Sequence, residues 1–243
     1  MLSSGDYRNN MNYTSSRELK NTARDKMLGQ YGTAIGAFLF MRVIIIMTLG
    51  MCMSLFSQYR VMLIIATFII TLFEGIFVYG ELSIYLKIAV GIQTQSMDVF
   101  SAFRGAADRA IKARLVFVVI VYGSALAYSG IEALCDILKI PYAAYIDAFA
   151  FVILGALCIW LLLTYSQVMY FLQDFSSISV KEALLRSRKL MQGNKKTLLL
   201  MYISFIPIYI VGVLSFMVGI YFLHPYVKMT LTEFYLDRVK KTT

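Results

Sequence analysis

Long apolar runs alternate with short, basic and polar stretches along this 243-residue chain. The clearest runs cover residues 61–73, 115–131, 145–172 and 197–223. A helix needs roughly 20 apolar residues to cross the ~30 Å hydrocarbon core of a bilayer. A soluble core of this size could not bury so many runs, so the pattern predicts an all-α membrane protein.

The apolar runs divide into six predicted membrane-spanning helices arranged as three hairpins. The last apolar region can be interpreted as one span or as two. Pro207, Gly212 and Gly219 favour a bend or turn within it, which makes two. The six predicted spans cover residues 34–57, 61–88, 115–136, 144–172, 197–216 and 218–237.

Two of the polar stretches resemble each other. Residues 15–33 and 179–197 agree at six of nineteen positions, and 96–114 is a more degenerate third copy. One interpretation is a unit of one amphipathic helix and one hairpin written three times, and the other is chance similarity between segments of like composition. If the repeat is real, the chain consists of a polar leader (1–14) and one integral membrane domain (15–240). The three repeat units of that domain are residues 15–88, 96–172 and 179–237.

Each polar stretch is predicted to form an amphipathic helix in the cytoplasmic interface. Ser15 and Ser179 are candidate N-caps, and the glutamate three residues after each completes a capping box. In the second stretch Val180, Leu184 and Met191 lie near one helical face. In the third stretch the apolar residues that recur at helical intervals are Met97, Phe100, Phe103, Ala107 and Ile111.

Basic residues gather in four segments of the chain. Five lie in 1–32, five in 87–114, six in 181–196 and four in 228–241, which is 20 of the chain's 23. Positive residues favour the cytoplasmic side, so six spans with both termini inside fit this distribution. We expect the short helices to contact anionic lipid headgroups or a membrane protein partner through Arg17, Arg24, Arg104, Lys181, Arg186, Arg188 and Lys189. Because the charge is spread over juxtamembrane segments, nucleic acid is not an expected partner.

Ionisable residues inside the predicted spans are the sharpest chemical signal. Each costs at least ~2.5–3.5 kcal/mol at the bilayer centre, so such groups face the bundle interior and pair. Glu74 and Glu81 are seven residues apart and share a helical face. Arg42 is expected to pair with Glu81 or to lie between both acids, and Lys228 is expected near Glu74. Gln167 completes this predicted polar cluster, which is either a binding site or pathway for an ion, peptide or lipid headgroup, or a structural set of ion pairs.

The second helices of the three hairpins also align loosely. Residues 79–86, 165–172 and 226–233 each begin with tyrosine and carry a polar residue two positions later. These polar residues are Glu81, Gln167 and Lys228.

Catalytic chemistry has little support in the sequence. The sole histidine, His224, precedes a proline near the predicted outer end of the last span, where a structural role is expected. Nucleotide-binding, hydrolase and zinc-protease motifs are not found. Cys52, Cys135 and Cys158 lie in or beside apolar segments, where thiols behave as small hydrophobes. We therefore expect no catalytic residue, metal site or cofactor.

The residues at 16–36, 182–195 and 224–235 together resemble the bacterial integral-membrane family known as domain of unknown function 975. The resemblance implies a protein of about six spans in the cytoplasmic membrane of a bacterium, and it supplies no catalytic residues. The expected function is a non-enzymatic membrane scaffold or an accessory subunit of an envelope or transport system. The alternative is a small permease or flippase for a lipid, peptide or ion that uses the charged cluster.

Overall fold

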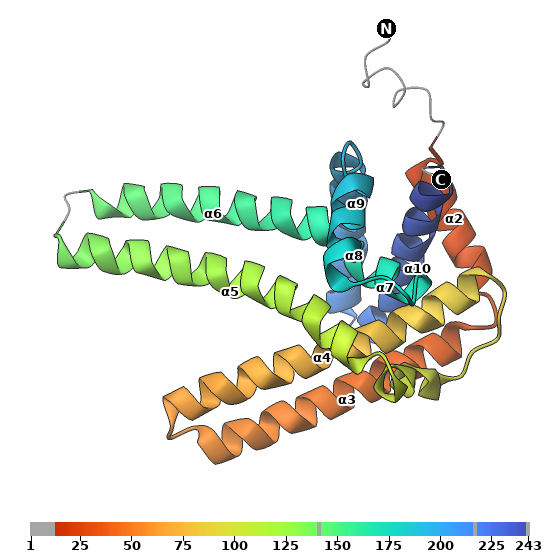
Figure 1. Ribbon diagram of the computed structural model, residues 1–243, viewed down its shortest axis with the longest axis horizontal. Helices are drawn as coiled ribbons and strands as arrows, with labels where there is room; N and C mark the ends of the chain where they lie inside the picture. The colour runs from red at the N-terminus through yellow and green to blue at the C-terminus, as the bar shows by residue number, and fades with distance from the viewer. Residues whose placement is uncertain (1–12, 140–141, 216–217, 242–243) are drawn as a thin grey trace, which may run out of the picture.

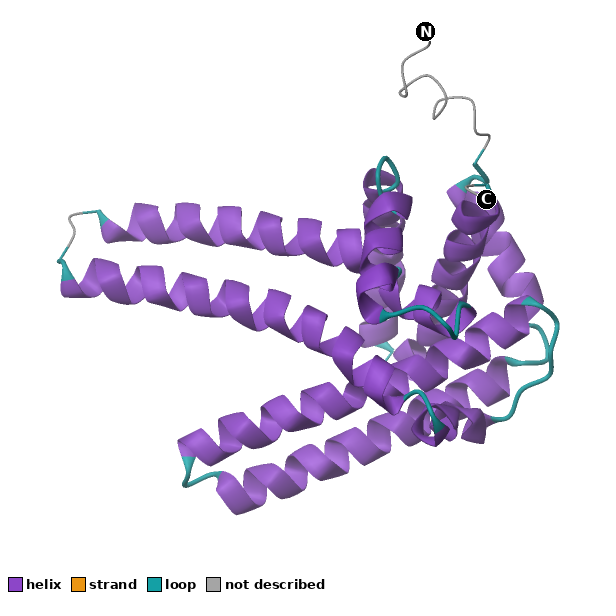
Figure 2. Cartoon of the chain, in the orientation of Figure 1, coloured by secondary structure: helices purple, strands orange, loops and turns teal. Residues whose placement is uncertain are grey.

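The computed structural model describes residues 13–139, 142–215 and 218–241, and the chain there forms helices joined by turns, with no strand (Figures 1 and 2). The helices are α2 (Ser16–Met27), α3 (Tyr31–Phe56), α4 (Arg60–Ala89), η1 (Ser96–Arg104), α5 (Ala107–Ile137), α6 (Ala143–Tyr165), α7 (Val168–Asp174), α8 (Val180–Leu190), α9 (Lys195–Leu214) and α10 (Val218–Lys240).

Five helices in the described part of the chain are long and apolar enough to cross a membrane. They are α3, α4, α5, α9 and a fifth formed by α6 and α7 together, Ala144–Asp174. The structure therefore confirms an all-helical fold in the described residues, with five helices that could cross a membrane by length and composition. Residues 1–12 of the predicted polar leader lie outside the described residues, as do residue 216, the last of the fifth predicted span, and residue 217 between the last two spans.

Two of the long helices differ from the apolar runs that predicted them. α5 begins at Ala107, eight residues before the predicted span, because its first turns bury Ala110 and Ala113 and expose charged side chains. The predicted fourth span is broken between α6 and α7 at Ser166 and Gln167. The backbone N–H of Gln167 donates to the Ser187 hydroxyl (3.3 Å), so a side chain of α8 satisfies a group at this break.

The short helices α2 and α8 begin as predicted. Ser15 accepts a hydrogen bond from the Glu18 N–H, and the Glu18 carboxylate accepts one from the Ser15 N–H, which confirms the capping box. Ser179 likewise accepts from the Glu182 N–H (3.2 Å). The Glu182 carboxylate binds Arg186 instead (2.6 Å), so the second box is only half formed.

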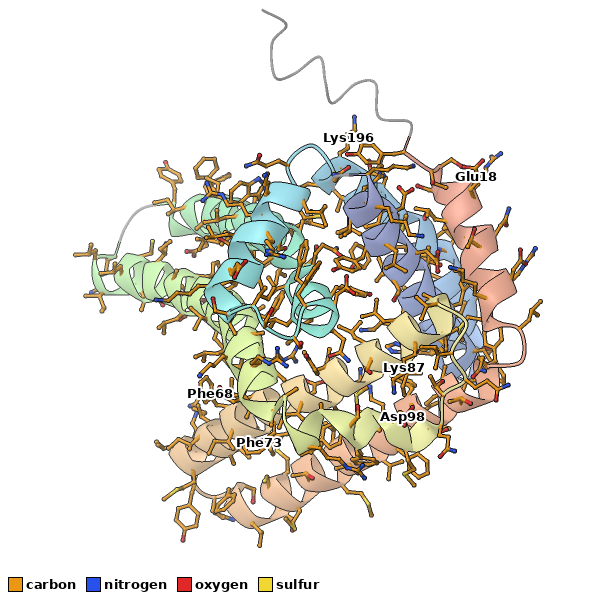
Figure 3. The ribbon with its side chains drawn as sticks, turned by 45° about the vertical axis from the view of Figure 1, so that its right-hand side comes forward. Glu18, Phe68, Phe73, Lys87, Asp98 and Lys196 are labelled. Atoms are coloured by element: carbon orange, nitrogen blue, oxygen red, sulfur yellow. The ribbon has the colours of Figure 1, made fainter. Side chains whose placement is uncertain are left out.

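The segment that precedes α5 is not the predicted α-helix. Residues Ser96–Arg104 form the 3₁₀ helix η1, which has three residues per turn. The buried residues are therefore Val99 and Ala102, three apart, while Met97 and Phe103 are exposed. Phe100 and Phe103 of the predicted apolar face nevertheless contact the Phe77 ring of α4 with ring centroids 5.9 and 5.2 Å away, so this face lies partly against α4. Lys87 at the end of α4 and Asp98 of η1 lie beside each other (Figure 3), with Nζ and Oδ2 3.2 Å apart.

The core forms where the C-terminal parts of α4 and α10 meet α7. The buried segments of this core are residues 79–85, 167–172 and 229–235. They overlap the three eight-residue segments that align in the sequence, 79–86, 165–172 and 226–233. The Tyr79 hydroxyl donates to the Leu172 carbonyl (2.9 Å), which joins α4 to α7. Tyr170 and Tyr235 stack with ring centroids 5.0 Å apart, which joins α7 to α10.

The other ends of the long helices carry their apolar side chains on the outside. The α3–α4 and α5–α6 pairs extend to one side of the molecule and diverge toward their tips (Figure 1). Phe68 and Phe73 of α4 lie on this extended part (Figure 3). We call these exposed apolar segments the apolar band; they are Leu39–Leu55 of α3, Val61–Phe73 of α4, Leu115–Ile137 of α5, Tyr145–Trp160 of α6 and Leu199–Leu214 of α9.

Candidate functional site

Two carboxylates of α4 connect this helix to three others. Glu74 lies between two arginines: its Oε2 is 2.5 Å from a guanidinium nitrogen of Arg114 in α5, and its Oε1 is 3.7 Å from one of Arg42 in α3. Arg114 also donates from Nε to the Thr71 carbonyl (3.2 Å). Gly75 admits this contact, because a Cβ there would lie 2.5 Å from the Arg114 Cβ.

The second carboxylate, Glu81, lies two turns further along α4 and is fully buried. Its Oε1 is 2.7 Å from His224 Nε2 and 3.4 Å from the Tyr85 hydroxyl. Its Oε2 is 3.8 Å from Lys228 Nζ and makes no hydrogen bond within the described part of the chain. His224 and Lys228 are four residues apart on α10, so one turn of that helix faces Glu81.

The structure thus brings together four of the five residues of the predicted polar cluster, with different partners. Arg42 pairs with Glu74 rather than Glu81, and Lys228 pairs with Glu81 rather than Glu74. Gln167 lies apart from them: it is buried beside α8, and its Nε2 donates to the neighbouring Ser166 hydroxyl (2.9 Å).

Sequence reasoning missed Arg114 and His224. Arg114 was counted among the cytoplasmic basic residues because it precedes the apolar run of α5. The signal that could have identified Arg114 was its position beside two alanines. Ala110 and Ala113 are small enough for this part of the helix to pack closely against another helix, and both are buried. His224 was expected to be structural, and in the structure its ring stacks on Phe38 (centroids 3.9 Å apart) while its Nε2 contacts Glu81.

The Glu74 pair lies at one edge of the apolar band. Glu74 directly follows Phe73, the last exposed apolar residue of α4, and Arg114 directly precedes Leu115, the first of α5. Lys195 has a similar position at the start of α9, where its Nζ lies 3.6 Å from the centroid of the Trp160 ring. Charged groups therefore mark the level where exposed apolar surface begins.

The basic residues predicted to contact lipid or a partner lie mostly on the surface. Arg186 is half-buried, since it pairs with Glu182 and lies over the Phe175 ring (5.0 Å). The exposed members are Arg17, Arg24, Arg104, Lys181, Arg188 and Lys189. Lys20, by contrast, turns inward from α2 and donates to the Ser204 hydroxyl of α9 (2.7 Å), and burial lowers the pKa of its ammonium group.

Among the described residues, no group of three His, Cys, Asp or Glu side chains could hold a metal ion. The arrangement consists of ion pairs between helices: one carboxylate with two guanidinium groups, and one carboxylate with an ammonium group and an imidazole. These ion pairs connect the helices to one another and place positive charge at the edge of the apolar band.

Comparison with known proteins identifies a family. The family described as "Protein of unknown function (DUF975)" matches residues 109–242, which confirms the resemblance over that range. The motif at 16–36 lies outside the matched residues. No curated protein and no solved structure matches the chain.

Proposed function

This chain belongs to the DUF975 family of proteins of unknown function, and we propose that it is a non-enzymatic membrane scaffold or accessory subunit of an envelope or transport system. One observation carries the proposal: the two carboxylates of α4 are bound by basic side chains from α3, α5 and α10. Breaking the pair of the buried Glu81 would leave an uncompensated charge, which costs several kcal/mol, so this pair favours a fixed arrangement. A rigid helical frame suits a protein that presents surfaces to partners.

In this proposal α10 is the sixth span, and the helices form three hairpins in the plasma membrane of a bacterium. Both termini and the three short helices lie on the cytoplasmic side. The Thr14 hydroxyl donates to Asp237 Oδ1 (2.5 Å), and this contact between the two ends of the chain supports their lying on one side. The basic residues of the short helices support that side being the cytoplasmic one.

α8 offers the surface for a partner. Its inner face buries Ala183, Ser187 and Leu190, and its outer face exposes Leu185 between basic side chains. An exposed leucine with neighbouring positive charge can contribute both apolar area and electrostatic complementarity to an interface.

The test is purification from native membranes in a mild detergent, with identification of bound proteins by mass spectrometry. We expect a stoichiometric membrane protein that is lost from the Arg188→Gln/Lys189→Gln variant. The matched control, Arg60→Gln/Lys139→Gln, removes the same charge from two exposed residues outside the short helices and is expected to retain the partner. A chain that purifies without any stoichiometric protein in all three forms contradicts the scaffold proposal.

A small permease or flippase is the second candidate, and one observation favours it. Glu81 Oε2 is buried and accepts no hydrogen bond from the described residues, and Lys228 at 3.8 Å is too far to donate one. A buried carboxylate that keeps one oxygen without a hydrogen bond is the kind of group that can gain a partner during transport. Flux of a lipid, peptide or ion into proteoliposomes that disappears in Glu81→Gln would favour this candidate over the scaffold.

A further inference from the structure

The charges around Glu74 do not cancel. Two guanidinium groups, those of Arg42 and Arg114, face a single carboxylate, so this trio carries one excess positive charge. Arginine stays protonated in proteins, so the excess is permanent. We propose that Arg42, supported by Arg114, binds a phosphate group at the edge of the apolar band, carried by an anionic lipid headgroup or present as free phosphate.

The hydrogen bonds identify Arg42 as the member of the trio with donors to spare. Arg114 uses Nε on the Thr71 carbonyl and a terminal nitrogen on Glu74. Within the described residues Arg42 makes a 3.7 Å ion pair and a contact over the Phe38 ring (5.2 Å), and neither is a hydrogen bond. Its side chain is 41% exposed, so a guanidinium with five N–H groups is open to a ligand.

The chemistry of the group favours phosphate. Guanidinium presents two parallel N–H groups that match two oxygens of a phosphate, and such charge-assisted pairs are stronger than neutral hydrogen bonds. The nearby Glu74 cannot saturate Arg42, because its other oxygen is held by Arg114 at 2.5 Å. An incoming anion therefore completes the charge balance of the trio.

The position of the site explains how a lipid would supply the phosphate. Leu39 and Phe40 of α3 and Phe73 of α4 are exposed apolar residues next to the trio. A lipid whose chains cover these residues would hold its headgroup at the level where the apolar band ends. This inference does not depend on the scaffold proposal, because the same site could serve a scaffold or a permease.

The test measures lipid binding to the purified full chain in nonionic detergent by native mass spectrometry. The probes are phosphatidylglycerol, which has a net negative charge, and phosphatidylcholine, whose ammonium group cancels its phosphate charge. We expect phosphatidylglycerol to bind more tightly than phosphatidylcholine. Arg42→Gln is expected to weaken phosphatidylglycerol binding about tenfold or more, the effect of losing a hydrogen bond to a charged group.

Glu74→Gln supplies the decisive comparison. Arg42→Gln and Glu74→Gln both break the same ion pair, so loss of structure alone would move lipid binding in the same direction. A phosphate site requires opposite directions, because Glu74→Gln removes the competing negative charge and should strengthen phosphatidylglycerol binding several-fold. Arg60→Gln removes a charge from the exposed first residue of α4, at the opposite end of the apolar segment from Glu74, and should leave the binding unchanged.

The remaining outcomes either identify the source of the phosphate or overturn the proposal. If excess inorganic phosphate displaces phosphatidylglycerol from the wild-type chain, the site accepts free phosphate; if it does not, the site is specific for lipid. Equal binding of phosphatidylglycerol to the wild type and Arg42→Gln, or weaker binding in both Arg42→Gln and Glu74→Gln, overturns the proposal. If Arg42→Gln fails to fold, Arg42→Lys keeps the charge, loses the planar fork, and is expected to bind with intermediate affinity.

Discussion

Gly80 is the residue where the packing of η1 on α4 can be tested most directly. A Cβ added at this position would overlap the Val99 carbonyl group of η1 and lie 2.7 Å from its carbon. Overpacking costs about 1–3 kcal/mol, and a clash with rigid backbone belongs at the upper end. Alanine regains about 1 kcal/mol of helix propensity over glycine. The Gly80→Ala variant is therefore expected to lose about 2 kcal/mol of stability, because the first term exceeds the second.

Gly50→Ala is the matched control for this substitution. Gly50 also lies inside a long helix, α3, but a Cβ added there meets nothing within 4 Å. The propensity term is similar in both variants, so the difference between them, about 3 kcal/mol, isolates the clash with η1. Each kcal/mol shifts the melting temperature of a domain of this size by about 2–4 °C.

The assay is thermal unfolding of the purified chain in detergent, followed by size-exclusion chromatography or by intrinsic fluorescence. We expect Gly80→Ala to melt several degrees below the wild type and Gly50→Ala to melt at or above it. If both variants melt at the same temperature, η1 does not rest on Gly80, and the close contact that the structure shows between these elements is refuted.

Three further substitutions test other parts of the fold. Ser15→Ala removes the N-cap of α2 and should cost about 1 kcal/mol in the same melting assay, and an unchanged melting temperature would argue against the capping box. Glu81→Gln weakens the contacts that hold α10 to α4, so hydrogen exchange of residues 218–228 should accelerate while that of α9 stays constant. Gly193 has φ +83°, so Gly193→Ala should destabilise the chain by about 1–2 kcal/mol, whereas Gly193→Asn, which tolerates this conformation, should cost less.

The helices were largely predictable because apolar runs and cap residues act locally. The similarity between residues 15–33 and 179–197 also acquires a physical basis. Met27 and Met191 are fully buried, and Gly29 and Gly193 have φ values of +80° and +83° in the turns that follow the short helices. The repeat stays a prediction, but these aligned residues play the same part in the chain at both places.

Partner choice among the charged residues could not be predicted, since it depends on how the helices cross. Lys228 was expected near Glu74 and pairs with Glu81, whereas Arg42 was expected to pair with Glu81 or to lie between both acids and pairs with Glu74. The assignment treated the helices as parallel and compared depths along them. In the structure the N-terminal part of α10 meets the N-terminal part of α3, where His224 stacks on Phe38. A crossing of this kind is set by side-chain packing over the whole contact, which no single residue encodes.

The helix packing also changes how the positions of Glu74 and Glu81 in α4 are interpreted. This helix has 30 residues and is about 45 Å long, well beyond the ~30 Å that a bilayer core requires. Only its first half, Val61–Phe73, belongs to the apolar band, and its second half is buried in the core. Glu74 lies at the junction of the two halves and Glu81 lies within the core.

A charge in a long apolar helix is therefore not evidence of a charge at the middle of a membrane. In this chain the apolar pattern continues through the junction because protein replaces lipid as the apolar surroundings, and the two glutamates are tolerated because neighbouring helices supply their counter-charges.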